Sequence, residues 1–143
     1  MASLLAVGAL SVGAIAAGCG DDDSGGGDVG ELKVGVLVPL TGGLGPLGGP
    51  AAQAAELAAT QVNAAAEPIG LNLTLFQEDT KSDPQAAAEA ATKLVESDGV
   101  TAIAGPWGTD EVTTVAENVT IPAGIPIVSP SATKVTSSST QAV

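Results

Sequence analysis

From residue 31 onward, short apolar runs alternate with alanine-rich stretches. Nearly continuous apolar runs are typical of strands buried on both faces of a parallel sheet, whereas apolar residues three and four positions apart indicate helices. Residues 71–78 instead alternate apolar and polar side chains, which predicts a strand with one wetter face near a sheet edge. The predicted strands are residues 33–40, 71–78, 100–105 and 125–128, and the predicted helices are residues 51–66, 84–97 and 110–118.

Proline, glycine and aspartate mark the ends of the predicted helices. Pro50 fits the first turn of the first helix, and Gly70 follows its end. Asp83 is an N-cap residue placed directly before Pro84, and Gly99 stops the second helix. Strands that alternate with helices of this length are parallel and joined by right-handed crossovers. The sequence therefore predicts an α/β fold, a doubly wound (Rossmann-like) parallel sheet.

The N-terminal part of the chain has a different pattern. Residues 4–17 are apolar, the single cysteine, Cys19, follows them, and a stretch rich in glycine and aspartate comes next. This order is typical of a bacterial lipoprotein, whose thiol takes a lipid and whose polar tether follows. Two alternatives are a membrane span, although the run is shorter than the roughly 18 residues needed, and an incidental buried thiol.

On the lipoprotein interpretation, residues 1–19 are a signal peptide with its lipidation cysteine, 20–31 a flexible linker and 32–143 the folded part. The mature protein would be extracytoplasmic and anchored to the membrane by its lipid. Ala16 departs from the larger aliphatic usual three residues before the cysteine, and the first basic residue is Lys33. Because a signal peptide opens with basic residues, we expect the true start to lie upstream of Met1.

Composition narrows the classes of function. The chain carries 16 acidic residues against 4 lysines, for a net charge of −12, and it has neither histidine nor arginine. Nucleic-acid binding needs cations that displace counterions from phosphates, so it is excluded. Histidine-based acid–base catalysis, histidine metal sites and Ser-His-Asp triads are excluded within this chain. We therefore expect no catalytic residue, no metal and no cofactor.

In an open parallel sheet, ligands bind beyond the carboxyl ends of the strands. Two of the loops at that edge are rich in hydroxyl groups: Thr109 lies near a helix start, and Ser129, Ser131 and Thr133 follow the fourth strand. Such loops could hold a carboxylate without arginine. The alternatives are a helix N-cap at Thr109 and an ordinary turn around Ser131. Trp107 could stack on a ligand or pack against the sheet.

Two further patterns admit more than one interpretation. Residues 43–48 match the G-x-G-x-x-G fingerprint of an NAD(P)-dependent oxidoreductase, but Pro46 interrupts them and the helix is expected to open later than the fingerprint requires. Glu78, Asp79 and Asp83 cluster after the second strand and could bind an amine or a metal. A helix cap with solvated loop charges is the interpretation we favour for this cluster.

An ordered set of segments resembles the branched-chain amino-acid (Leu/Ile/Val-type) substrate-binding proteins of ABC transporters, which have the type I periplasmic binding fold. The matching segments are residues 33–42, Asp79, residues 83–84, residues 94–95, residues 98–100, Gly105 and residues 125–133. The resemblance covers the chain from about Leu32 to its end. It implies two α/β lobes that close on a ligand, of which this chain would be an incomplete first lobe.

The resemblance also implies a ligand site. In this family the hydroxyl residue after the third strand and the Ser-Ala-Thr segment after the fourth hold the main-chain groups of an amino acid. Carried over, these residues are Thr109, Ser131, Ala132 and Thr133, with Trp107 in place of a first-loop aromatic that this chain lacks. The implied partners are an amino acid and an ABC permease in the membrane.

Two expectations follow from an incomplete first lobe. Part of the apolar sheet surface should lack a cover, which would make residues 31–143 alone prone to aggregate. The same lobe also occurs in the ligand-binding domains of sensory receptors, and the lobe alone does not separate a receptor from a transporter protein. We favour the transporter, because a receptor generally continues into a membrane span.

Overall fold

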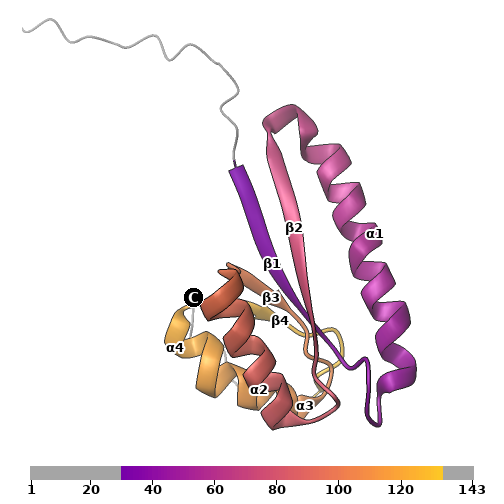
Figure 1. Ribbon diagram of the computed structural model, residues 1–143, viewed down its shortest axis with the longest axis vertical. Helices are drawn as coiled ribbons and strands as arrows, with labels where there is room; N and C mark the ends of the chain where they lie inside the picture. The colour runs from indigo at the N-terminus through magenta and orange to yellow at the C-terminus, as the bar shows by residue number, and fades with distance from the viewer. Residues whose placement is uncertain (1–29, 134–143) are drawn as a thin grey trace, which may run out of the picture.

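The structure, a computed structural model, describes residues 30–133. Four parallel strands form one sheet in the order β2-β1-β3-β4 (Figure 1). The strands are β1 (Gly30–Val38), β2 (Leu71–Asp79), β3 (Ala102–Ala104) and β4 (Ile127–Val128). The longer helices are α1 (Gly48–Ala66), α2 (Pro84–Lys93) and α3 (Thr109–Val115). The fold class predicted from the sequence is confirmed, and β2 lies at a sheet edge as its alternating pattern predicted. The predicted signal peptide, most of the predicted linker and residues 134–143 lie outside the described residues.

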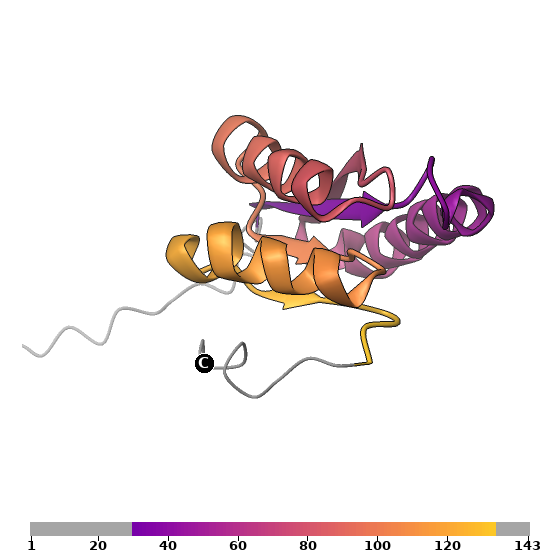
Figure 2. The same cartoon turned by 90° about the horizontal axis from the view of Figure 1, so that it is seen from below.

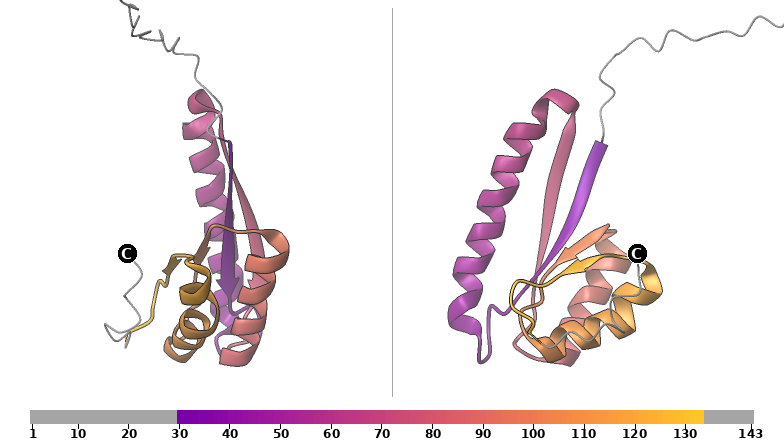
Figure 3. Two further views of the ribbon diagram at one scale, coloured as in Figure 1. Left: turned by 90° about the vertical axis from the view of Figure 1, so that its left-hand side faces the viewer. Right: turned by 180° about the vertical axis from the view of Figure 1, so that it is seen from behind.

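The strand order places the helices on opposite faces of the sheet. The chain moves from β1 outward to β2 through α1, and then back past β1 to β3 through α2. Because both crossovers are right-handed, the reversal of direction puts α1 on one face and α2 with α3 on the other. Figures 2 and 3 show α1 set apart from the α2–α3 pair, which pack side by side.

The main core lies between the sheet and the α2–α3 pair. Leu37 on β1 and Ile103 on β3 are almost completely buried there, and alanines on one side of α2 allow a close approach. Apolar residues of both α2 and α3 face this core. The buried cluster is Leu37, Ala87, Ala90, Ala91, Leu94, Val100, Ile103 and Val115.

Local chemistry explains most helix ends. The Asp83 side chain accepts hydrogen bonds from the N–H groups of Gln85 and Ala86 at 3.0 and 2.8 Å, so the predicted N-cap is confirmed. Gly70 and Gly99 follow their helices with φ of 65° and 68°, the left-handed conformation that favours glycine.

Several predicted bounds were wrong. The first helix opens at Gly48 rather than residue 51, after a short 3-10 turn η1 (Gly45–Leu47). The second helix was predicted over residues 84–97; it runs as α2 and then as a π-helical turn η3 (Leu94–Asp98), so its predicted end lies within one residue of the observed one. The third continues through η4 (Ala116–Thr120) into α4 (Ile121–Ala123), and a 3-10 turn η2 (Glu67–Ile69) closes the first. β3 and β4 are shorter than the apolar runs that predicted them.

The α1 side of the sheet is only partly covered among residues 30–133. α1 packs on β1 and β2, and an apolar groove of about 530 Å³ runs between α1 and the ends of β3 and β4. Val128 on β4 has 71% of its surface exposed beside this groove. In the view from behind, no helix lies in front of β3 and β4 (Figure 3, right). This arrangement agrees with the expected uncovered sheet surface. None of the described helices has the length and apolar character needed to span a membrane.

Gly48 and its neighbour Gly49 offer a matched test of the packing that sets the start of α1. A Cβ on Gly48 would lie 2.2 Å from the Pro39 carbonyl oxygen, whereas one on Gly49 would meet nothing within 4 Å. We expect Gly48→Ala to lower the free energy of unfolding by about 1–3 kcal/mol. Gly49→Ala should raise it by up to about 1 kcal/mol, because alanine favours the helix. Urea unfolding measures both changes. Equal changes in the free energy of unfolding for the two variants would contradict the close approach of Gly48 to the Pro39 carbonyl.

Candidate functional site

Asp79 ties together the loops that follow β1 and β2. Its carboxylate accepts a hydrogen bond from the Thr41 hydroxyl at 2.6 Å and others from the N–H groups of Thr41 and Lys81 at 3.2 and 2.8 Å. Ser82 adds a second link, because its hydroxyl donates to the Thr41 carbonyl at 3.0 Å and accepts from the Leu44 N–H at 2.9 Å. The first loop is therefore held in place by side chains from the second.

These contacts also set the ionisation of Asp79. Partial desolvation raises the pKa of the Asp79 carboxyl, but the hydrogen bonds from the Thr41 hydroxyl and from the N–H groups of Lys81, Thr41 and Leu40 together outweigh it. The net result is a pKa below the usual value, because the donors stabilise the charged form.

Hydroxyl groups link the loops that follow β3 and β4. Ser129 donates to the Pro106 carbonyl at 2.7 Å, and Ser131 donates to the Trp107 carbonyl at 2.6 Å. The Thr133 N–H donates to the Thr109 hydroxyl oxygen at 3.3 Å. The two loops selected from the sequence thus lie side by side and are joined at three points.

The predicted ligand-binding residues divide between two places. Thr109, Ser131, Ala132 and Thr133 come together, with the Ala132 N–H donating to Ser129 Oγ at 3.2 Å. Trp107 contributes only its carbonyl to this group of residues. Its side chain lines the apolar groove on the α1 side. The N-cap alternative for Thr109 is wrong, because Gly108 is the N-cap and Thr109 is the first helical residue.

A second cavity, of about 470 Å³, adjoins Thr109. Residues of three loops line it: Gly43, Leu44, Ser82, Pro84, Gly108, Thr109, Asp110 and Glu111. The cavity combines glycine backbone and one aliphatic side chain with a serine, a threonine and two carboxylates. It is open to solvent at the carboxyl edge of the sheet, where the sheet rule places ligands.

Glu111 is a residue of this region that the sequence reasoning missed. It has 3% of its surface exposed, and its Oε2 atom accepts a hydrogen bond from the Gly108 N–H at 2.6 Å. This is the backward half of a capping box, in which the third helical residue bonds the N-cap backbone. The spacing of Gly108 and Glu111 at a helix start was the signal that could have revealed it. Its Oε1 atom is buried and has no partner among the described residues.

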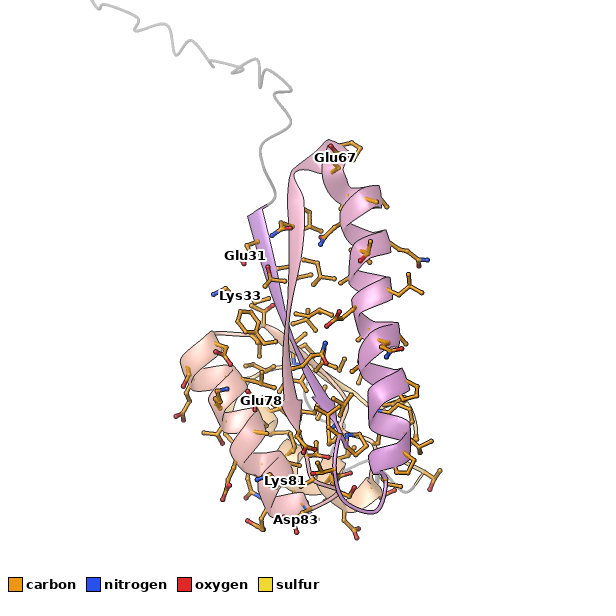
Figure 4. The ribbon with its side chains drawn as sticks, turned by 45° about the vertical axis from the view of Figure 1, so that its right-hand side comes forward. Glu31, Lys33, Glu67, Glu78, Lys81 and Asp83 are labelled. Carbon is orange, nitrogen blue, oxygen red and sulfur yellow. The ribbon has the colours of Figure 1, made fainter. Side chains whose placement is uncertain are left out.

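The acidic cluster after β2 has separate structural roles. Asp83 caps α2, Glu78 forms an ion pair with Lys93 and Asp79 holds the first loop. Figure 4 shows Lys81 and Asp83 at the carboxyl edge, far from Glu67 at the other end of the fold. Among residues 30–133, no group of three or more acidic, cysteine or histidine side chains could hold a metal ion. The favoured interpretation of a helix cap is confirmed for Asp83.

Residues 43–48, the candidate dinucleotide fingerprint, do not form the required geometry. The middle of the segment is the 3-10 turn Gly45–Leu47, and α1 opens at the last glycine of the pattern. In the fingerprint, the chain turns right after the strand and the helix opens immediately. The glycine at position 48 is explained by packing against Pro39.

Comparison with known proteins identifies the family. A sequence model of the periplasmic binding protein family matches residues 31–142. A Leu/Ile/Val-binding protein homolog 8 of Brucella abortus is 38% identical over 96 residues, which are 67% of this chain and 23% of that protein.

Solved structures give the same result. The branched-chain amino acid substrate-binding protein LivJ of Streptococcus pneumoniae, in complex with isoleucine, is 31% identical with a TM-score of 0.66, covering 73% of this chain and 30% of that one. A putative branched-chain amino acid ABC transporter protein of Rhodospirillum rubrum is 25% identical with a TM-score of 0.67, over the same shares.

The chain belongs to the periplasmic binding protein family. The predicted resemblance to the Leu/Ile/Val-type substrate-binding proteins of ABC transporters is confirmed. This is a family of binding proteins, and its location is extracytoplasmic. The chain spans less than a third of the length of these relatives.

Asp79 provides a pH-dependent test of the loop linkage. Because its pKa is lower in the folded protein than the unfolded value of about 3.9, its contribution to stability is present above that value and is lost as pH falls through the folded pKa. Asp79→Asn should therefore destabilise the protein at pH 6, and the difference from wild type should shrink by pH 3. Urea unfolding at both values measures this. Glu89→Gln, an exposed change on α2, serves as the control and should show no such pH dependence.

Proposed function

We propose that this chain belongs to an extracytoplasmic solute-binding protein that captures an amino acid and delivers it to an ABC importer. The observation that carries the proposal is the pairing of Thr109 with Thr133 across the β3 and β4 loops. It places hydroxyl groups at the carboxyl edge of the sheet, where open parallel sheets bind ligands. The LivJ neighbour was crystallised with isoleucine, which supports an amino acid as the ligand class.

The hydroxyl groups that join the two loops still have hydrogen-bond positions available for a ligand. Thr109 Oγ1 accepts a hydrogen bond from Thr133, so its own proton is free to be donated to a carboxylate. Ser131 Oγ donates to the Trp107 carbonyl, so its lone pairs are free to accept from an ammonium group. The loops are already fixed before the ligand arrives, which lowers the entropic cost of binding.

The rest of the site comes from outside the described lobe. In our proposal a second lobe, in the part of the relatives that this chain does not span, closes over the ligand and contacts the face turned away from Thr109. Closure excludes water, so each hydrogen bond to the ligand is worth more than it would be in the open cleft. The first lobe would set the position of the main-chain groups, and no chemical step on the ligand is proposed.

Thr133→Ala tests this assignment in the full-length natural protein. The change leaves the N–H bond to Thr109 intact and removes only the hydroxyl. We expect amino-acid affinity to fall by about 1–3 kcal/mol, roughly 5- to 150-fold, because a buried ligand group loses its partner. Isothermal titration calorimetry measures the change. Thr60→Ala on α1, whose hydroxyl bonds the Glu56 carbonyl, is the matched control. Unchanged affinity in Thr133→Ala would remove Thr133 from the site.

We also propose that Cys19 carries a lipid that anchors the protein at the membrane surface, where it meets its permease. The support is the order in the sequence of an apolar run, the cysteine and a stretch rich in glycine and aspartate, all outside the described residues. The described fold begins at Gly30, so the proposed linker would separate it from the anchor.

Cys19→Ser tests the anchor. In a bacterial host expressing the full-length gene, the wild-type protein should incorporate radiolabelled palmitate and sediment with membranes, because only a thiol accepts the lipid. The variant should do neither. Ser24→Ala, in the proposed linker, is the control and should behave as wild type. Equal labelling of wild type and Cys19→Ser would refute lipidation at this residue.

A further inference from the structure

We propose that Ser82 is a positioning residue for ligand selectivity, which acts by holding Leu44 where it contacts the side chain of the bound amino acid. This inference rests on the proposed function and adds side-chain selectivity to it. Its starting point is the Ser82 hydroxyl, which donates to the Thr41 carbonyl at 3.0 Å and accepts from the Leu44 N–H at 2.9 Å. Both hydrogen bonds join the loop after β2 to the loop after β1.

The loop after β1 has little rigidity of its own. Glycine occupies positions 42, 43 and 45, on both sides of Leu44, and glycine leaves the backbone more conformations than any other residue. A turn in which the Gly45 N–H donates to the Gly42 carbonyl at 3.1 Å gives the loop a local shape. The turn does not tie Leu44 to the sheet, so its position depends on the bond from Ser82.

The loop after β2 is turned tightly against this glycine-rich segment. Lys81 and Ser82 have φ of 54° and 56°, a left-handed conformation that residues other than glycine seldom adopt. Gly42 lies against them so closely that a Cβ on it would be 2.1 Å from the Lys81 carbonyl oxygen. Strained conformations of this kind persist only where the surrounding contacts hold them, and they cluster at binding sites. Here the strained turn brings the Ser82 hydroxyl within reach of the Leu44 N–H.

Leu44 and Ser82 both line the cavity of about 470 Å³ that Thr109 also lines. Thr109 belongs to the pair of residues that is proposed to hold the main-chain groups of the ligand. A ligand held at Thr109 can therefore extend its side chain toward Leu44. The volume lies within the range of about 300–1,000 Å³ that is typical of small-molecule pockets.

The wall around Leu44 suits an aliphatic group. Leu44 is partly exposed, and with Pro84 it supplies the apolar side chains of the cavity lining. Of the two acidic residues in the lining, Glu111 has only 3% of its surface exposed, and Asp110 is exposed to water. An aliphatic side chain placed against Leu44 and Pro84 is stabilised by the burial of apolar surface on both partners.

The test compares two amino acids that share their main-chain groups and differ in the size of an aliphatic side chain. In calorimetry on the full-length natural protein at pH 7, L-leucine should bind about 10-fold or more tightly than L-alanine, because its three additional carbon atoms are buried. Leu44→Ala should reduce this leucine preference below about 3-fold and leave the affinity for alanine unchanged.

Two glycine substitutions in the strained turn assign the positioning role to the Ser82 hydroxyl. Glycine adopts the left-handed conformation readily, so Ser82→Gly and Lys81→Gly both keep the turn, and only Ser82→Gly removes a bond to Leu44. The leucine preference should fall below about 3-fold in Ser82→Gly and stay at the wild-type value in Lys81→Gly. A role of Ser82 in stability alone would alter the amount of folded protein and leave the ratio of the two affinities unchanged.

A double variant tests whether Ser82 acts through Leu44. Because both changes remove the same contact with the ligand, Ser82→Gly combined with Leu44→Ala should lower the leucine affinity no further than Leu44→Ala alone. Losses that multiply would overturn the positioning role, as would a leucine preference that survives in Ser82→Gly or disappears in Lys81→Gly. A preference that survives in Leu44→Ala would place the ligand side chain elsewhere and overturn the whole inference.

The same titrations separate this inference from the proposed function. Equal affinities of the wild-type protein for leucine and alanine would overturn the selectivity role and leave an amino-acid-binding protein. Binding of neither probe, while another of the twenty amino acids binds, would have the same meaning. Failure of all twenty amino acids to bind would overturn both the inference and the proposed function.

Discussion

The two-sided burial of β1 is the constraint on which the rest of the structure depends. Leu37 faces the α2–α3 core, while Val36 and Val38 face α1 and the apolar groove. A strand buried on both faces must lie inside the sheet, and β1 pairs in parallel with β2 on one side and β3 on the other. The carboxyl ends of these strands therefore meet at one edge. Gly105, with φ of 101°, lets the β3 loop pass close to the Leu37 carbonyl.

At that edge, loops are joined in pairs by short polar side chains rather than by arginine. Asp79 and Ser82 hold the loop after β1, and Ser129 and Ser131 hold the loop after β3. Each of these hydrogen bonds uses one donor or acceptor position of a side chain that has several. The hydroxyl groups that fix the loops therefore keep donor or acceptor positions available, which is the basis of the proposed carboxylate site in a lobe without arginine.

The apolar groove and the smaller cavity of the described lobe differ in chemistry and in their position relative to the proposed ligand site. The groove beside α1 is apolar and lies on the sheet face, where burial of Val128 would stabilise the fold. The smaller cavity lies at the carboxyl edge, is lined by carboxylates and adjoins Thr109. Trp107 lines the groove, whereas Thr109 lines the cavity.

The sequence by itself determined the order of elements, the burial of β1, the cap at Asp83 and the edge at which the hydroxyl loops gather. These features depend on local patterns and on the handedness of crossovers, which a single chain of residues displays. Only the tertiary structure decided that α1 opens at Gly48, that Ser131 bonds the Trp107 carbonyl and that Glu111 is buried beside a cavity. The physical reason is that these outcomes depend on contacts between loops far apart in the chain, whose distances are set only when the sheet has formed.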